Sequence, residues 1–296
     1  MDGKRQLGEF LRTHRSRLRP EDVGLVAYGE RRRVPGLRRE ELALLAGVSA
    51  SYYSRLERGH SLNASPEVLD AIAQALGLEE AERRHLHDLA AVRRRPAGGR
   101  RPAPERVTAA VRQLVAAMAD VPVIVLGVRG DVLAWNRTGH ALYAGHLDAG
   151  SPDRPAERPN MTRLVFCDAH TREMYADWTQ KARDVVGGLR LAAGQNPADP
   201  KLASLIGELM MQSTEFARMW ADHKVRPCDV GVYDMRHPLV GAMTVNQQTL
   251  RTAQGQRIVV ATAEPGSASE NALVLLSRAA MSADGDSAVA KESRLT

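Results

Sequence analysis

The 296-residue chain has little cysteine and no long apolar run. Its two cysteines, Cys167 and Cys228, lie far apart without CxxC spacing or a nearby pair of histidines, which argues against a disulfide framework and against a zinc site. No segment approaches the roughly 18 apolar residues that span a bilayer, and the opening MDGKRQLGEF lacks the apolar core of a signal peptide. We therefore expect a cytoplasmic chain with buried or inert thiols and no membrane partner.

The common catalytic motifs are also missing. The chain contains no GxSxG, HExxH, P-loop or GxGxxG pattern, and its Gly187-Gly188 pair falls inside a helical pattern rather than a phosphate-binding loop. The histidines of the second half show no pairing that stands out and no spacing that favours a haem ligand: His140, His146, His170, His223 and His237. We therefore expect a protein that is not an enzyme and that needs no metal and no cofactor.

The positive charge is confined to the first third of the chain. Residues 1–106 contain 21 Lys and Arg against 15 Asp and Glu, whereas residues 107–296 contain 20 of each. A basic segment beside a neutral one favours a polyanion partner for the first segment only, because neutralising phosphates releases their counterions. Basic surface is also common on faces that simply meet solvent, so charge alone does not decide.

Residues 39–59, REELALLAGVSASYYSRLERG, have the apolar spacing of two helices that cross over one tight turn. The side chains expected to converge on one small core are Leu42, Ala46, Val48, Tyr53 and Leu56. Ala43 leaves room where the second helix crosses, Gly47 suits a turn with positive φ, and Ser49 is a good cap for the next helix. Together these features favour a helix-turn-helix over an ordinary helical hairpin.

The segment VSASYYSRLERG is similar to the recognition segment of phage-repressor-type helix-turn-helix regulators, the xenobiotic-response-element family. That resemblance implies a second helix in the major groove of DNA with its N-terminal residues against the bases. At about 100° per residue, Ser51 and Arg55 share a face opposite Tyr53 and Leu56. The residues expected to contact bases are Ala50, Ser51 and Arg55, and those expected to contact phosphates are Arg39, Tyr52 and Arg58.

Two charged residues of the motif have structural alternatives. Arg58 equally suits an interaction with the C-terminal end of its own helix. Glu57 is expected to be structural and to pair with a nearby Arg, since a carboxylate that faced phosphates would repel them. The Arg31-Arg32-Arg33 cluster lies either along a phosphate backbone or in solvent.

Helical spacing and breakers divide the chain into four parts. An opening helix around residues 7–14, the two helices of the motif, a helix begun by Ser65-Pro66-Glu67 and a fifth over residues 78–92 predict an all-α head, residues 1–92. His85 and His87 are expected at its surface. A Pro-, Gly- and Arg-rich linker spans 93–105, a second domain spans 106–280, and a flexible tail spans 281–296.

The second domain has a mixed pattern. An amphipathic helix over 106–120 precedes a hairpin of residues 121–126 and 132–135 around a Gly-Asp turn. The further elements predicted are helices over 171–191, capped by Asp168 or Thr171, over 201–221 and over 271–280, with strands over 229–235, 242–250 and 257–262. The pattern fits an α+β domain with one antiparallel sheet, helices on one face and room for an interior pocket.

Five segments carry a second resemblance: WNRTGHALY, NMTRLVF, REMYADWTQKARDVVGGLR, MRHPLVGAMTV and TAEPGS. In order and spacing they are similar to the ligand-binding domain of MmyB-like transcription regulators. The resemblance implies a PAS-like sensor domain behind the helix-turn-helix, with a long apolar pocket for a fatty-acid-like molecule. Composition and periodicity by themselves indicate only a second domain rich in Leu, Val and Met.

A ligand of that kind needs one polar anchor for its carboxylate, and the planar fork of Arg suits a carboxylate. Arg163 is the first candidate, with Asn160 three residues earlier and able to share its helical face, and Arg236 is the second. The alternative is that both arginines form ion pairs with Asp168, Asp177 or Asp234. The methionines Met174, Met210, Met211 and Met219 either line an adaptable pocket or are ordinary core.

These observations lead us to expect a transcription regulator that binds a double-stranded DNA operator as a homodimer, because one helix-turn-helix reads few bases and two-fold repetition extends the site. The second domain would bind a fatty-acid-like small molecule. The alternative is a DNA-binding regulator whose second domain only dimerises or binds a protein partner.

Overall fold

The computed structural model describes residues 3–25, 36–60, 64–91, 105–222 and 229–292, with side chains for those between residues 5 and 282. They form two compact units, Met1–Arg100 with Gly187–Pro227, and Arg101–Val186 with Cys228–Thr296. The Arg31-Arg32-Arg33 cluster, His223, Cys228 and nearly all of the expected linker lie outside the described residues. Each unit is described by itself below.

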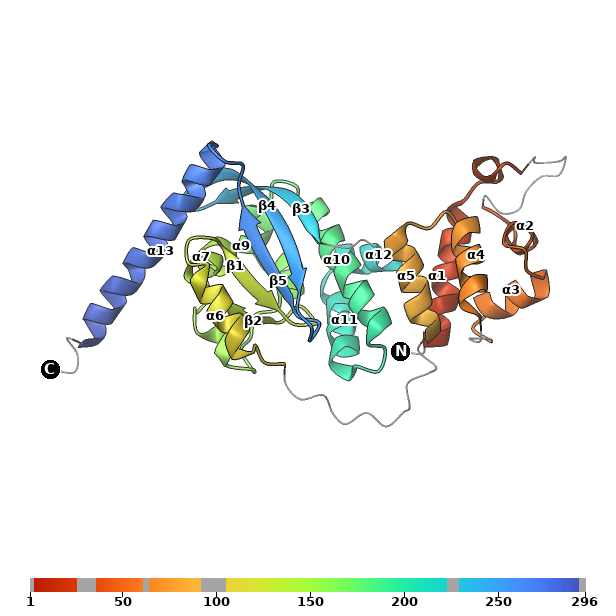
Figure 1. Cartoon of the computed structure of the whole chain (residues 1–296), viewed down its shortest axis with the longest axis horizontal. Coiled ribbons are helices and arrows are strands. Elements are labelled where there is room, and N and C mark those ends of the chain that lie inside the picture. The colour runs from red at the N-terminus through yellow and green to blue at the C-terminus, as the bar shows by residue number, and fades with distance from the viewer. Residues whose placement is uncertain (1–2, 26–35, 61–63, 92–104, 223–228, 293–296) are drawn as a thin grey trace. The chain divides into compact units, whose positions relative to one another are not determined.

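The head contains the five predicted helices: α1 Gly3–Arg17, α2 Arg39–Leu45, α3 Ala50–Glu57, α4 Pro66–Ala75 and α5 Glu80–Ala91. A short 3-10 turn, Pro20–Val23, follows α1. The predicted local signals are confirmed: Ser49 accepts from Tyr52 N and Ser65 from Val68 N, and Gly47 adopts a φ of +65° between α2 and α3. Figure 1 shows α1, α4 and α5 side by side.

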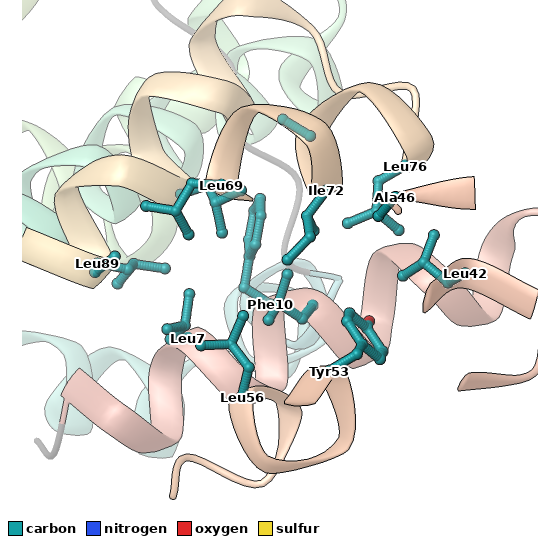
Figure 2. Close-up of a cluster of buried hydrophobic side chains, with 14 of the residues drawn as sticks. Leu7, Phe10, Leu42, Ala46, Tyr53, Leu56, Leu69, Ile72, Leu76 and Leu89 are labelled. Atoms are coloured by element: carbon teal, nitrogen blue, oxygen red, sulfur yellow. The ribbon is translucent and has the colours of Figure 1, made fainter. Parts of the chain in front are cut away.

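The core of the head gathers one apolar side chain or more from each helix. Phe10 of α1, Tyr53 and Leu56 of α3 and Ile72 of α4 are at most 1% exposed and point toward one another in Figure 2. Burial of a large apolar side chain is worth about 1.5–3 kcal/mol, so these contacts hold α1, α3 and α4 together. His85 was expected at the surface, but it is 3% exposed and its ring packs edge-on against Phe10, so that prediction is wrong.

The first unit also contains the end of α10, Trp178–Gln195, and the helices α11, Pro200–Gln212, and α12, Thr214–Ala221. The prediction of one helix over 201–221 is wrong. Ser213 is extended (φ −134°, ψ 116°), and its hydroxyl caps α12 by accepting from Phe216 N. Met210 and Met211 are exposed at 43% and 88%, so they do not line an interior pocket.

The second unit is built on a five-stranded sheet in which every pair of neighbouring strands is antiparallel, in the order β2-β1-β5-β4-β3. The strands are β1 Val123–Leu126, β2 Val132–Trp135, β3 Val230–His237, β4 Gly241–Arg251 and β5 Arg257–Thr262. The hairpin β1-β2 and all three later strands are therefore as predicted, within two residues. In Figure 1, β5 lies between β1 and β4.

The central strands are covered on both faces. Val115 of α6, Ala109–Ala117, packs in one cluster with Val123 and Val125 of β1. Ile124 lies between these two residues in β1, points to the opposite face and is also buried. The helix α7, Arg137–Ala144, also packs against β1. Both faces of β1 are therefore buried. β3 alternates between exposed and buried residues over its second half, as a strand with one open face should.

Residues 171–191 were expected to form one helix, but the structure has two. Asp168 caps α9, Ala169–Met174, by accepting from Thr171 N, which confirms the predicted cap. The chain then extends at Tyr175, which pairs with Met235 of β3 in an isolated bridge, before α10 begins. Upstream, α8 spans Met161–Cys167, and Cys167 is exposed.

The last helix, α13, spans Ala268–Glu292 and so passes the expected end at residue 280. Frequent alanines and the absence of proline after residue 280 are compatible with that extension. Among the described residues, no helix is both long and apolar enough to cross a bilayer. Within the same residues, no group of three or more His, Cys, Asp or Glu side chains is arranged to hold a metal ion.

Candidate nucleic-acid interface

The helix α3 separates an outward face from a core face, as its sequence predicts. Tyr53 and Leu56 are fully buried, whereas Ala50, Ser51 and Arg55 are exposed. The buried pair fixes the rotation of α3, so the three exposed side chains share the outer side. Within the part of the chain that the structure describes, Arg55 forms no ion pair, and its charge is available to an external partner.

The buried carboxylate of Glu57 connects α3 to α1 and α2 through hydrogen bonds. Glu57, whose side chain is 1% exposed, takes two bonds from Arg15 of α1, at 2.8 Å from Nε and 3.0 Å from Nη2. Arg39 of α2 donates a third bond, Nε to Oε1, at 2.9 Å. This confirms that Glu57 is structural, and it adds a partner, Arg15, that the sequence analysis missed.

The charges in this cluster stabilise one another. Burial by itself would raise the pKa of Glu57, but the bonds and charges of Arg15 and then Arg39 outweigh it and hold that pKa below its ordinary value. Burial, reinforced by the charge of Glu57, raises the pKa of the adjacent Tyr53 phenol far above its ordinary value. Glu57 is therefore ionised and Tyr53 neutral at neutral pH.

A polar groove of about 550 Å³ lies beside this cluster, lined by Arg5, Glu9, Arg12, Arg39, Glu57, Arg58, Gly59 and His60. It contains two of the three residues expected at phosphates, Arg39 and Arg58; the third, Tyr52, is half-buried on α3. Arg39 bonds Glu57 through Nε, yet its side chain is 38% exposed. Arg5 and Arg12 were missed by the sequence analysis, although their spacing of seven residues places both on one face of α1.

Of the three residues expected to bind a ligand in the second domain, two are exposed and one is buried. Arg163 and Arg236 are exposed. Asn160 is 3% exposed; its Oδ1 accepts from the backbone N of Thr162 and Arg163, and its Nδ2 donates to Asp131 Oδ1 and a backbone carbonyl. The structure therefore gives Asn160 a full set of partners at the start of α8 and places no two of the three side chains together in the interior.

One histidine pairing escaped the sequence analysis because its members are far apart in the chain. His146 Nε2 lies 3.3 Å from Asp168 Oδ2, and its ring packs against His170 at 4.1 Å. Burial lowers the pKa of His146, although the nearby Asp168 works against that shift. Asp168 also caps α9, so one carboxylate contacts both His146 and the start of that helix.

Comparison with known families finds a match for each half of the chain. A family model described as a helix-turn-helix domain matches residues 6–86. A second, described as the MmyB-like transcription regulator ligand binding domain, matches residues 107–276, more than half of the chain. The chain belongs to the MmyB-like transcription regulators. It is thus a DNA-binding transcription regulator with a ligand-binding domain, and both domains of this MmyB-like protein are of regulatory families. No curated protein matches it.

Proposed function

We propose that this MmyB-like regulator binds double-stranded operator DNA by inserting α3 into the major groove, where Arg55 reads a guanine and Ser51 and Ala50 contact neighbouring bases. The major groove is wide enough for a helix and carries a full donor and acceptor code. The observation that carries the proposal is the exposed Arg55, without an ion-pair partner in the described residues, on a helix whose opposite face is fully buried.

Phosphate contacts would come from the edge of the same surface. Arg39 and Arg58 line the polar groove with Arg5 and Arg12, and Tyr52 follows Ser51 on α3. Glu57 also lines this groove, but its side chain is 1% exposed and its negative charge is balanced by Arg15 and Arg39. Contacts of this kind position the helix and make binding sensitive to salt without reading sequence.

The test begins with selection of a preferred duplex from a random pool, followed by binding to that duplex and to a scrambled duplex of equal length. Arg55→Ala should reduce the preference by about 1–3 kcal/mol while leaving salt-sensitive binding to both duplexes. Arg84→Ala removes an exposed arginine of the head that pairs with Glu80. It should change neither the preference for the selected duplex nor the salt-sensitive binding. An unchanged preference in Arg55→Ala would refute the assignment of the reading face.

The regulator is further proposed to act as a homodimer, with a PAS-like second domain that binds a fatty-acid-like molecule. The dimer is supported by the few bases that one helix-turn-helix reads. The ligand is supported by the MmyB-like family match over a domain with a five-stranded antiparallel sheet. The exposed Arg163 and Arg236 suit a carboxylate at the domain surface, with Asn160 ordering the start of α8 beneath Arg163.

Mass spectrometry of lipid extracted from the denatured, purified protein tests the ligand. An empty extract together with no thermal shift by long-chain acids would favour the second candidate function, in which this domain only dimerises or binds a protein. Sedimentation of the purified chain at several concentrations tests the homodimer, and a monomer throughout would contradict it.

A further inference from the structure

Part of the ligand-binding family range folds with the helix-turn-helix head. Residues 187–222, which we call the adaptor segment, contain the end of α10 together with α11 and α12, and they belong to the same compact unit as the head. In the sequence they fall between β2 and β3, inside the range matched by the ligand-binding family. The contacts between the adaptor segment and the head therefore join two parts of the chain that the family division separates.

The end of α10 packs closely against the head. Leu191 contacts the apolar core of the head, whose buried members come from residues 7–90. Gly194 lies so near His85 of α5 that a Cβ built on it would be 2.5 Å from Cε1 of the imidazole. Beside them, Gln195 Nε2 donates to Oδ2 of Asp88 at 3.3 Å. A fit without room for one methyl group is typical of a close-packed interior.

A buried arginine and an ion pair extend this interface to α12 and α1. Arg190 is 5% exposed; its guanidinium stacks on the Trp220 ring at 4.3 Å and donates to the Trp220 carbonyl. Arg17 of α1 donates to the carbonyl of Asp222 and lies 3.6 Å from its carboxylate. The cavity that remains between α1, α5, α10 and α12 measures about 60 Å³, which is room for a few water molecules.

We propose that the head and the adaptor segment form one cooperative folding unit, in which the face made by α1 and α5 is the docking surface for α10 and α12. Separation of the two parts would expose the head core at Leu191 and break the contacts of Arg17 with Asp222. Loss of apolar burial and of these bonds favours joint over separate unfolding.

The consequence is a connection between the sheet and the DNA-reading helix. α10 is one helix from Trp178 to Gln195, and its first half belongs to the second unit, where Lys181 donates to Gln247 of β4. Its second half belongs to the unit of the head. Rigid secondary elements carry coupling between distant sites, so α10 gives the ligand-binding domain a continuous helical route to the head.

The test is amide hydrogen exchange of the full chain, read by mass spectrometry with and without the duplex selected above. A ligand of the folded head slows every amide that exchanges through unfolding of the same unit by the factor 1 + [L]/Kd. With free duplex at about 100 times its Kd, the most protected amides of α1, α5, α11 and α12 should therefore all exchange about a hundredfold more slowly. Slowing in α1 and α5 alone would overturn the shared unit and leave DNA binding in place.

Three variants test whether the docking surface carries the effect. Leu191→Asp places a charge against the head core and should confine the slowing to α1 and α5. Met211→Asp introduces the same charge at a position 88% exposed on α11 and should leave the slowing of all four helices unchanged. If Leu191→Asp fails to fold, Gly194→Leu decides, because its side chain would displace the ring of His85. Full slowing of α12 in that variant would overturn the interface.

A measurement without DNA separates this inference from the proposed function. In increasing urea, the most protected amides of α1, α5, α11 and α12 should converge on one exchange free energy with one slope. Separate free energies and slopes for the head and the adaptor segment would overturn the shared unit, whatever the result with DNA. The absence of slowing in α1 and α5 with every duplex, together with convergence in urea, would instead overturn the proposed DNA binding alone.

Discussion

The ion cluster around Glu57 makes the sharpest prediction about stability. Glu57→Gln keeps the shape of the side chain but removes its charge, which leaves Arg15 buried at 10% side-chain exposure without its counter-ion. Removing one partner of a buried pair costs about 3–5 kcal/mol, and the retained amide oxygen still accepts one bond. We therefore expect the head to lose about 3 kcal/mol of unfolding free energy.

The comparison variant is Arg39→Gln. The side chain of Arg39 is 38% exposed, so solvent screens its attraction to Glu57 and water replaces the lost bond. Its substitution should cost about 1 kcal/mol or less. Arg15 and Glu57 still pair in this variant, whereas Glu57→Gln leaves the buried Arg15 without a counter-ion.

Amide hydrogen exchange of the full chain, read by mass spectrometry in peptides of α1 and α3, measures the head separately from the second domain. A loss of about 3 kcal/mol speeds exchange of the most protected amides by more than a hundredfold, since each 1.4 kcal/mol is tenfold. Equal effects of Glu57→Gln and Arg39→Gln, or less than about 1 kcal/mol for the former, would refute the role assigned to the buried pair.

The pH dependence gives an independent check. The pKa of Glu57 is lowered in the folded protein, so its contribution is fully present above the unfolded value of about 4.3 and is lost as pH falls through the folded value. The deficit of Glu57→Gln relative to the unsubstituted protein should therefore shrink as pH falls below about 4.3. A deficit that stays constant in this range, after correction for intrinsic exchange, would contradict the direction of the shift.

Four further substitutions test packing and capping. Gly139→Ala would place a Cβ 2.2 Å from the carbonyl oxygen of Val123 and should lower stability by about 1–3 kcal/mol or more in thermal melts, whereas Gly207→Ala, which meets nothing within 4 Å on α11, should raise it by up to about 1 kcal/mol. Ala43→Leu adds bulk at a position 1% exposed between α2 and α3 and should cost about 1–3 kcal/mol, seen as faster exchange in both helices. Ser213→Ala removes the cap of α12 and should cost about 1 kcal/mol in denaturant unfolding; no change in midpoint would show that the cap is dispensable.

The elements predicted well are those whose causes are local. A capping Ser, a turn Gly and apolar side chains three or four apart lie within one segment, so the helix-turn-helix was predictable from 21 consecutive residues. The hairpin β1-β2 was predictable in the same way, because its turn residues separate two short apolar runs. These signals do not depend on any partner distant in the sequence.

Two helix breaks were missed, one because it depends on a distant partner and one because its local cap resembles an ordinary helical Ser. Tyr175 leaves the helical conformation to pair with Met235, sixty residues later, and nothing in the local apolar spacing differs from a continuous helix. Ser213 caps the helix that carries Phe216 into the core, but a Ser inside an apolar pattern is also tolerated in mid-helix. The burial of His85 was missed for the same reason, since Phe10 lies 75 residues before it.

The candidate sites differ in what a sequence can predict about them. The sign of the charge beside a phosphate surface predicted that Glu57 is structural and pairs with a nearby Arg, yet the choice of Arg15 required the crossing of α1 and α3. The anchor of the second domain was sought among arginines because their geometry suits a carboxylate, and both candidates proved exposed. No local signal marks Lys181 either. It is buried and its Nζ donates to Gln247, 66 residues further along the chain, so its surroundings depend on where the fold places β4 against α10.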